Sequence, residues 1–221
     1  DKLIQLQAIN SDFIKNAKSL LMKGNLNKDL KNFEVAILQI DSSILIHRSI
    51  TNIDYNLLKG QLWNRYYCYR NWGRFTEAKS CLLDLQNSFP KNKQIYQNTI
   101  AEFSIIEAQL GNFKESDKYI DMIVDLKSYY EDKIQLGLFY SNVANSFGQE
   151  KIDFQALKYA KKGMSQLKNY DPNSLEYLDA LMVYATSLQN SKVPKFNEAI
   201  KYYIEIENTK NEEYRNLRSY S

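Results

Sequence analysis

The sequence has few of the residues that most metal sites and many catalytic sites need. One His stands among 221 residues, which removes most zinc sites and any catalysis that needs a pair of imidazoles. Seven Gly and three Pro are too few to punctuate many β-hairpins or a parallel sheet, so an all-helical fold is favoured. Cys68 and Cys81 form no CxxC motif, and we interpret both as small buried hydrophobic residues.

Long apolar runs are also missing. No stretch approaches the roughly 20 apolar residues that cross a bilayer, so no membrane span is predicted. No signal peptide is visible. Because the sequence starts at Asp1 without Met and stops at Ser221 inside what reads as a new helix, we expect a trimmed or processed chain. A cytoplasmic location is slightly favoured by the two free thiols, and an exported bacterial protein is the alternative.

Charge and motifs exclude several functions. Lys and Arg (29) barely exceed Asp and Glu (26), and no basic stripe is visible, so we predict no nucleic-acid binding by this chain alone. Zinc-protease, phosphate-loop, dinucleotide, calcium-loop and nucleophile-elbow motifs are absent. We therefore predict a protein that is no enzyme and holds no cofactor or metal. His47 is expected at the hydrophilic C-terminal end of a helix, beside Arg48. A His in that position interacts favourably with the helix dipole.

A repeated helical pattern is the strongest positive signal. Phe75, Ala78 and Leu82 follow one another at helical spacing and predict one apolar helix face. Gly73 is expected to end the preceding helix in a left-handed conformation, and Pro90 to stop the following one.

Small residues recur at matching positions of this pattern. They are Ala36, Ala78, Ser116, Ala156 and Ala199, at spacings of 42, 38, 40 and 43 residues. A period near 40 with a helix in each half predicts a solenoid of helical hairpins, in which small side chains let paired helices approach closely. Gly163 is expected to be another close-packing position inside a helix. Before the repeats we expect one or two helices ending at Gly24, then a helix from about Leu30 to His47.

These units resemble tetratricopeptide (TPR) repeats. The matching residues are Gly73, Phe75, Ala78, Leu82 and Pro90 in one unit, and Tyr140, Val143, Ala144, Phe147, Ala156, Ala160, Gly163 and Met164 in another. The resemblance implies an all-α, right-handed superhelical α-solenoid of about five antiparallel helical hairpins. The family's signature Gly is replaced by Tyr66, Ser104, Ala144 and Ala185, and the period exceeds the family's about 34 residues. Such long units are similar to those of bacterial sensors and peptide receptors.

Three regions follow from the pattern. Residues 1–52 are expected to be a degenerate N-terminal repeat or cap, because a solenoid needs its end covered. Residues 53–210 are expected to hold the TPR-like repeats. Residues 211–221 are expected to start a capping helix or a further repeat.

The first helix of each hairpin in such a solenoid lines a groove. The predicted peptide-groove residues are Trp63, Tyr67, Arg70, Asn98, Glu102, Gln109, Asn142, Asn145, Gln149, Thr186 and Gln189, with Ile105, Ser141, Asp179 and Met182 facing the same channel. Asn and Gln can bind the backbone of an extended peptide. Trp63 and Tyr67 can stack on an apolar side chain, and Arg70 can bind a carboxylate. The alternative interpretation is that the amides simply face solvent.

The sequence thus predicts a non-enzymatic scaffold that binds a protein or peptide segment. One alternative is the sensing half of a bacterial regulator, because the units resemble those of peptide-pheromone receptors of Gram-positive bacteria. Another is an exported or periplasmic sensor module. A homodimer through the apolar ends of the solenoid is also expected.

Overall fold

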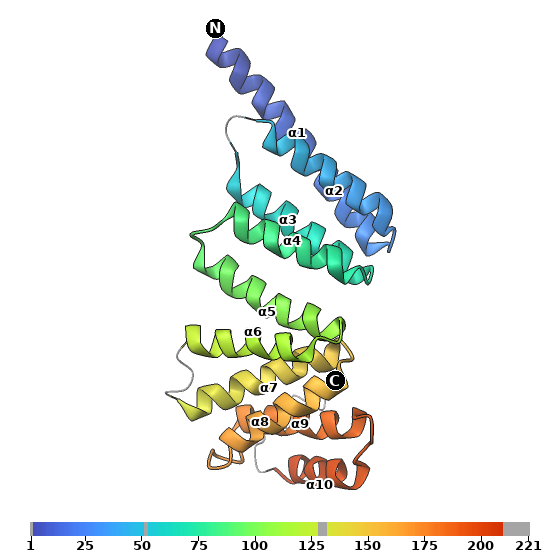
Figure 1. Cartoon of the computed structure of the whole chain (residues 1–221), viewed down its shortest axis with the longest axis vertical. Helices are drawn as coiled ribbons and strands as arrows, with labels where there is room; N and C mark the ends of the chain where they lie inside the picture. The colour runs from blue at the N-terminus through green and yellow to red at the C-terminus, as the bar shows by residue number, and fades with distance from the viewer. Residues whose placement is uncertain (1, 51–52, 128–131, 210–221) are drawn as a thin grey trace. The chain divides into compact units, whose positions relative to one another are not determined.

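The computed structural model describes residues 2–50, 53–127 and 132–209 of the chain, and the side chains from residue 11 onwards within these ranges. The described residues contain ten helices and no strand (Figure 1). The helices are α1 (Lys2–Asp29), α2 (Phe33–Arg48), α3 (Tyr55–Asn71), α4 (Phe75–Ser88), α5 (Lys93–Gln109), α6 (Phe113–Leu126), α7 (Lys133–Gln149), α8 (Asp153–Gln166), α9 (Leu175–Asn190) and α10 (Phe196–Glu207). The predicted all-α fold of repeated helical hairpins is confirmed.

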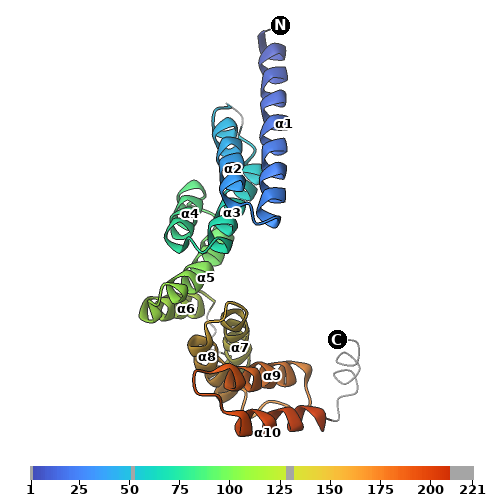
Figure 2. The same cartoon turned by 90° about the vertical axis from the view of Figure 1, so that its right-hand side faces the viewer.

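The chain divides into two compact units, which we describe separately. Unit 1 comprises residues 1–110 and unit 2 residues 111–221. In unit 1, α1 packs on α2 and α3 packs on α4, with α5 packed against α4; α1 and α2 lie side by side in both cartoon views (Figures 1 and 2). In unit 2, α7 packs on α8 and α9 on α10. The predicted boundary between residues 52 and 53 stays a prediction, and residues 211–221 lie outside the described residues.

The two kinds of helix start differently. The helices that open a hairpin are capped by side chains: the Asp54 carboxylate accepts from the first-turn amides of α3, and Asp132 does the same for α7. Four of the turns inside hairpins instead contain a left-handed residue, at Lys31, Gly73, Gly111 and Lys151. Gly73 has φ of 78° and Gly111 has φ of 80°, which confirms the predicted role of Gly73. Residues close to the helix ends in the sequence therefore set where these helices begin and end.

The predicted end of the first helix at Gly24 is wrong. Gly24 lies inside α1, which continues to Asp29, and α2 begins at Phe33 rather than Leu30. A Cβ on Gly24 would lie 2.6 Å from Ile40 Cγ1, so the glycine permits close packing of α1 on α2. The left-handed turn is made by Lys31, with φ of 62°. Because the turn is made by a lysine, no glycine marks its position in the sequence.

The predicted exposed position of His47 is also wrong. Its side chain is fully buried, although it occupies the last turn of α2. His47 Nε2 accepts from the Asp54 amide at 2.9 Å, and His47 Nδ1 lies 2.9 Å from Gln61 Oε1. Because Nε2 accepts, Nδ1 carries the proton and donates to Gln61. Gln61 in turn donates to Ser43 Oγ at 2.6 Å, so the imidazole links α2 to α3 and to the loop before α3.

Both cysteines are free and buried, as predicted. Burial raises the pKa of each thiol, Cys68 and Cys81, to about 11. A thiol with such a pKa is protonated at neutral pH and is a poor nucleophile. The two cysteines therefore act as packing residues.

The small residues that mark the repeat are all buried. Ala36, Ala78, Ser116, Ala156 and Ala199 are each at most 2% exposed. In the α7–α8 hairpin, Gly163 brings the helices closer still, because a Cβ there would lie 2.6 Å from Ser141 Oγ and 3.0 Å from the Gly137 carbonyl oxygen. The expected close-packing role of Gly163 is confirmed.

A polar cluster joins α6 to α8 in unit 2. The Asp117 carboxylate accepts from the Tyr159 hydroxyl at 2.7 Å, from the Gln155 amide at 3.1 Å and from the Lys158 ammonium. Burial by itself would raise the pKa of Asp117, but the hydrogen bonds from Lys158, Tyr159 and Gln155 outweigh it and lower the pKa below its ordinary value. Burial and the Asp117 hydrogen bond raise the pKa of Tyr159, so its hydroxyl stays a donor.

We expect Asp117→Asn to lower the free energy of unfolding at pH 7 by about 1–2 kcal/mol, because charge-assisted hydrogen bonds are lost. A carboxyl whose pKa is lowered by folding stabilises the protein above its unfolded pKa of about 3.9, and this contribution is lost as pH falls through the folded value. The difference between wild type and variant should therefore shrink below about pH 4. Urea titrations from pH 3 to 7 measure this. Asp12→Asn, at an exposed carboxylate of α1, is the control; a difference that persists at pH 3 would contradict the assignment.

Candidate functional site

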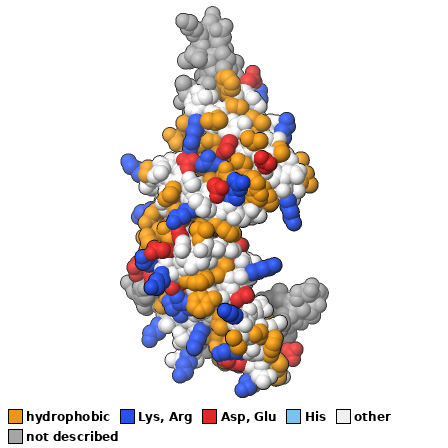
Figure 3. Space-filling model, turned by 45° about the vertical axis from the view of Figure 1, so that its right-hand side comes forward, with side chains coloured by type: hydrophobic (Ala, Val, Ile, Leu, Met, Phe, Trp, Pro, Cys, Tyr) orange, Lys and Arg blue, Asp and Glu red, His pale blue; other side chains and the backbone are white. Residues whose placement is uncertain are grey.

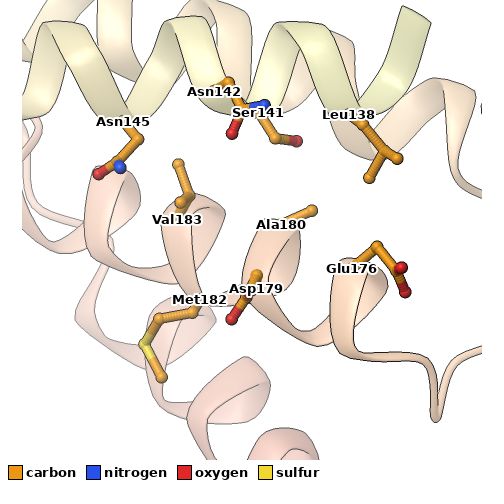
Figure 4. A pocket seen from close by; sticks show the side chains of 9 residues that line it. All are labelled: Leu138, Ser141, Asn142, Asn145, Glu176, Asp179, Ala180, Met182 and Val183. Carbon is orange, nitrogen blue, oxygen red and sulfur yellow. The ribbon is translucent and has the colours of Figure 1, made fainter. Parts of the chain in front are cut away.

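A hollow lies between α7 and α9, the opening helices of the two complete hairpins of unit 2 (Figure 4). Its volume is about 360 Å³. The lining residues are Leu138, Ser141, Asn142 and Asn145 from α7, and Glu176, Asp179, Ala180, Met182 and Val183 from α9. Figure 4 shows Ala180 and Val183 of α9 directed toward α7, whereas the side chains of Asp179 and Met182 point away from it.

A second hollow of about 230 Å³ continues the first. The two share Asn145 and Val183. The remaining lining residues of the second are Ala144, Gly148, Gln149, Asp153, Ala156, Thr186, Ser187 and Asn190. We call the two hollows together the α7–α9 groove. Small residues such as Ala144, Gly148 and Ala180 line it, so side chains do not fill the space between the helices.

The groove has hydrogen-bonding side chains on α7 and apolar side chains on α9. Asn142, Asn145 and Gln149 occur at spacings of three and four residues, and all three side chains are exposed on one face of α7. Within the described part of the chain, the side-chain amides of Asn142 and Asn145 make no hydrogen bond. Val183 and Ala180 provide apolar surface opposite them. A concave apolar surface with a few hydrogen-bonding groups is typical of ligand-binding sites in general.

Four of the predicted peptide-groove residues line this groove: Asn142, Asn145, Gln149 and Thr186. Gln189 is exposed on α9 but does not line it, and its amide oxygen accepts from the Tyr203 hydroxyl at 2.9 Å. Thr186 Oγ1 lies 3.3 Å from the same hydroxyl. Tyr203 thus orients both side chains from α10, a contact that the sequence pattern did not indicate.

Four residues that line the first hollow were not expected from the sequence: Leu138, Glu176, Ala180 and Val183. A signal for two of them was present. Glu176 and Val183 stand seven residues apart, with Asp179 between them, which places them on one helix face. The sequence pattern had placed Asp179 and Met182 of α9 in the channel, but not their neighbours Glu176 and Val183, which line the same hollow.

Four of the six predicted residues of unit 1, Trp63, Tyr67, Arg70 and Glu102, form a cluster on α3 and α5. Trp63 stacks on Tyr67 with ring centres 5.7 Å apart, and Tyr66 packs edge-on to Trp63. The Glu102 carboxylate accepts from the Tyr66 hydroxyl at 2.5 Å and lies 3.3 Å from Arg70 Nη1. Burial and the Glu102 charge raise the pKa of Tyr66, which keeps its hydroxyl protonated. Arg70 therefore already has an internal carboxylate partner.

Asn98 and Gln109 lie outside that cluster of contacts. Asn98 is exposed on α5, and its side-chain oxygen accepts from the Gln94 amide at 2.7 Å. Gln109 is half-buried at the C-terminal end of α5. In unit 1 the structure thus joins Trp63, Tyr67 and Glu102 with Arg70, while Asn98 and Gln109 are placed along α5 to either side of Glu102.

The described ranges show neither a metal site nor a membrane-spanning helix. No group of three or more His, Cys, Asp and Glu side chains there has an arrangement that holds a metal ion. No described helix combines the length and apolarity needed to cross a membrane. On the face drawn in Figure 3, Lys and Arg side chains are scattered among acidic and hydrophobic ones. Apolar side chains are exposed on the first hairpin at Met22, Leu26, Leu30, Leu38 and Leu45, and the predicted homodimer stays a prediction.

Comparison with known proteins identifies the fold. No family model matches the chain, and no curated protein matches it. Among solved structures, BtubC (BKLC) from P. vanneervenii is similar, with a TM-score of 0.53, 12% identity and coverage of 94% of this chain and 93% of that one. A candidate kinesin light chain from Podosopora anserina with nearly identical TPR-like repeats has a TM-score of 0.57, 12% identity and coverage of 86% and 92%. The chain therefore has the fold of a TPR-like repeat protein.

Proposed function

We propose that this protein is a non-enzymatic scaffold that binds a peptide segment of another protein in the α7–α9 groove. The observation that carries the proposal is the row of exposed amides on α7 above the apolar surface of α9. TPR-like folds of this kind are suited to protein interaction, because stacked helical hairpins present a continuous surface.

The groove suits an extended chain better than a compact ligand. Its lining runs from Leu138 to Gln149 along α7, which at 1.5 Å per residue is about 16 Å. An extended peptide rises about 3.3 Å per residue, so about five residues fit. Asn142 and Asn145 can each donate to a peptide carbonyl and accept from a peptide amide. Affinity would then come from the backbone, and selectivity from side chains that contact Ala180 and Val183.

The test is a selection of peptides followed by a block of the groove. Random linear dodecapeptides displayed on phage are selected on the immobilised protein, and the selected sequences are synthesised with a fluorescent label. Asn145→Tyr places a ring at the junction of the two hollows, so we expect at least a tenfold loss of affinity by fluorescence anisotropy. Asn142→Ala/Asn145→Ala should weaken binding about tenfold, because two hydrogen-bonding side chains are lost.

The matched control is Asn197→Tyr, the same exchange at an exposed position of α10 outside the groove. It should leave the affinity within about twofold of wild type. Circular dichroism checks that each variant retains its helical content. Selected peptides that bind wild type and Asn145→Tyr equally well would contradict the placement of the site.

A further inference from the structure

The α7–α9 groove differs in charge from the chain that forms it. Lys and Arg outnumber Asp and Glu in the whole sequence, 29 to 26. The ionisable residues that line the groove are Asp153, Glu176 and Asp179, and no Lys or Arg is among the described lining residues. A net basic protein thus presents a groove whose charged side chains are all acidic. A cationic ligand is favoured there over an anionic one.

The acidic side chains are unevenly placed. Glu176 and Asp179 line the same hollow near the N-terminal end of α9, beside Leu138 and Ala180. Asp153 lies at the other end, with Gln149 and Asn190. Glu176 lies in the first turn of α9, whereas Asp179 lies beyond it, where the helix dipole offsets less of its charge. The strongest negative potential from lining side chains is therefore at the Leu138 end.

The middle of the groove is uncharged. Asn142, Asn145 and Val183 separate the two acidic ends. This order places hydrogen-bonding amides where the backbone of a ligand would pass, and carboxylates where a long side chain would reach. Lys and Arg side chains have that length and carry the complementary charge.

We propose that the α7–α9 groove selects an extended peptide with a Lys or Arg side chain bound at the Glu176–Asp179 end. This inference rests on the proposed function of the groove and specifies the chemistry of its ligand. The cation contacts the two carboxylates, the peptide backbone lies along Asn142 and Asn145, and an apolar side chain contacts Val183. An acidic segment is rejected by the same carboxylates.

The experiment uses the dodecapeptides selected on the whole protein. Each is synthesised again with every Lys and Arg replaced by norleucine, which keeps an unbranched alkyl chain and removes the charge. On wild type we expect the selected peptides to contain Lys or Arg and the norleucine versions to bind about three- to tenfold more weakly. Raising NaCl from 50 to 500 mM should weaken the charged peptides more than the norleucine versions.

Variants then assign the effect to the groove. With Glu176→Gln/Asp179→Asn, the difference between each charged peptide and its norleucine version should fall below twofold. Glu115→Gln removes an exposed carboxylate of α6 outside the groove and should leave the difference as in wild type. This double comparison separates a local contact from the general charge of the protein.

The outcomes separate the two proposals. Peptides that lose affinity with Asn145→Tyr but contain no Lys or Arg, or do not respond to Glu176→Gln/Asp179→Asn, would overturn the cationic specificity and leave the groove as the peptide site. Peptides that bind Asn145→Tyr as tightly as wild type would overturn both the peptide site and its cationic specificity. A failure to select any peptide would do the same. Self-association that Asn145→Tyr abolishes would identify a second copy of this chain as the occupant and also overturn the cationic-peptide proposal.

Discussion

Replacing Gly163 by Leu should lower the free energy of unfolding of unit 2 by about 3 kcal/mol. A Cβ at this position would lie 2.6 Å from Ser141 Oγ, 3.0 Å from the Gly137 carbonyl oxygen and 3.1 Å from the Ser141 amide nitrogen. Two of these atoms belong to the backbone of α7, so relief requires the α7–α8 pair to separate. Gly163→Ala should already cost about 1–3 kcal/mol through overpacking, although Ala favours a helix over Gly by about 1 kcal/mol.

Urea unfolding followed by circular dichroism at 222 nm measures the loss. Gly60→Ala is the matched control, because Gly60 also lies inside a helix and a Cβ there meets no atom within 4 Å. It should stabilise the protein by about 0.5–1 kcal/mol. If Gly163→Ala stabilised the protein as Gly60→Ala does, the close approach of α7 and α8 would be refuted. Because Ser141 also lines the α7–α9 groove, Gly163→Leu should weaken peptide binding as well.

His47→Ala is expected to lower the free energy of unfolding of unit 1 by about 3 kcal/mol. The exchange empties a fully buried site and removes the partner of two polar groups, the Asp54 amide and Gln61 Oε1. A buried polar group that loses its partner keeps its desolvation penalty, which is why the cost exceeds that of one average hydrogen bond. The contact between α2 and α3 should loosen.

Tryptophan fluorescence during denaturation reports this change, because Trp63 and Trp72 are the two tryptophans of the chain and both belong to unit 1. Leu45→Ala is the control: Leu45 is 70% exposed in the same helix, and its loss should change the free energy by no more than about 0.5 kcal/mol. A His47→Ala protein as stable as Leu45→Ala would show that the buried hydrogen bonds contribute little.

The helical architecture followed from local signals. Phe75, Ala78 and Leu82 face one side of α4, and Gly73 supplies the left-handed turn before it. Such features depend on residues within about two helical turns of each other, so they are visible in the sequence. Lys31 takes the same left-handed conformation without being a glycine, and the end of α1 was therefore misplaced at Gly24.

The candidate site was predicted only in part for a different reason. Helical periodicity indicated that Asn142, Asn145 and Thr186 lie on the inner faces of their helices, and these residues line the α7–α9 groove. Periodicity does not state which residue of a distant helix lies opposite. Arg70 was expected to be available to a ligand, but Glu102, 32 positions along the chain, is its partner in unit 1.

The sequence by itself determined an all-α chain of helical hairpins, the buried small residues and the absence of recognised catalytic motifs, because these depend on composition and on spacing along single helices. Only the tertiary structure decided that His47 is buried, that Arg70 is paired and that α7 and α9 leave a groove whose charged residues are acidic. Each of these depends on how closely two helices approach, and that distance is set by side chains that are far apart in the sequence.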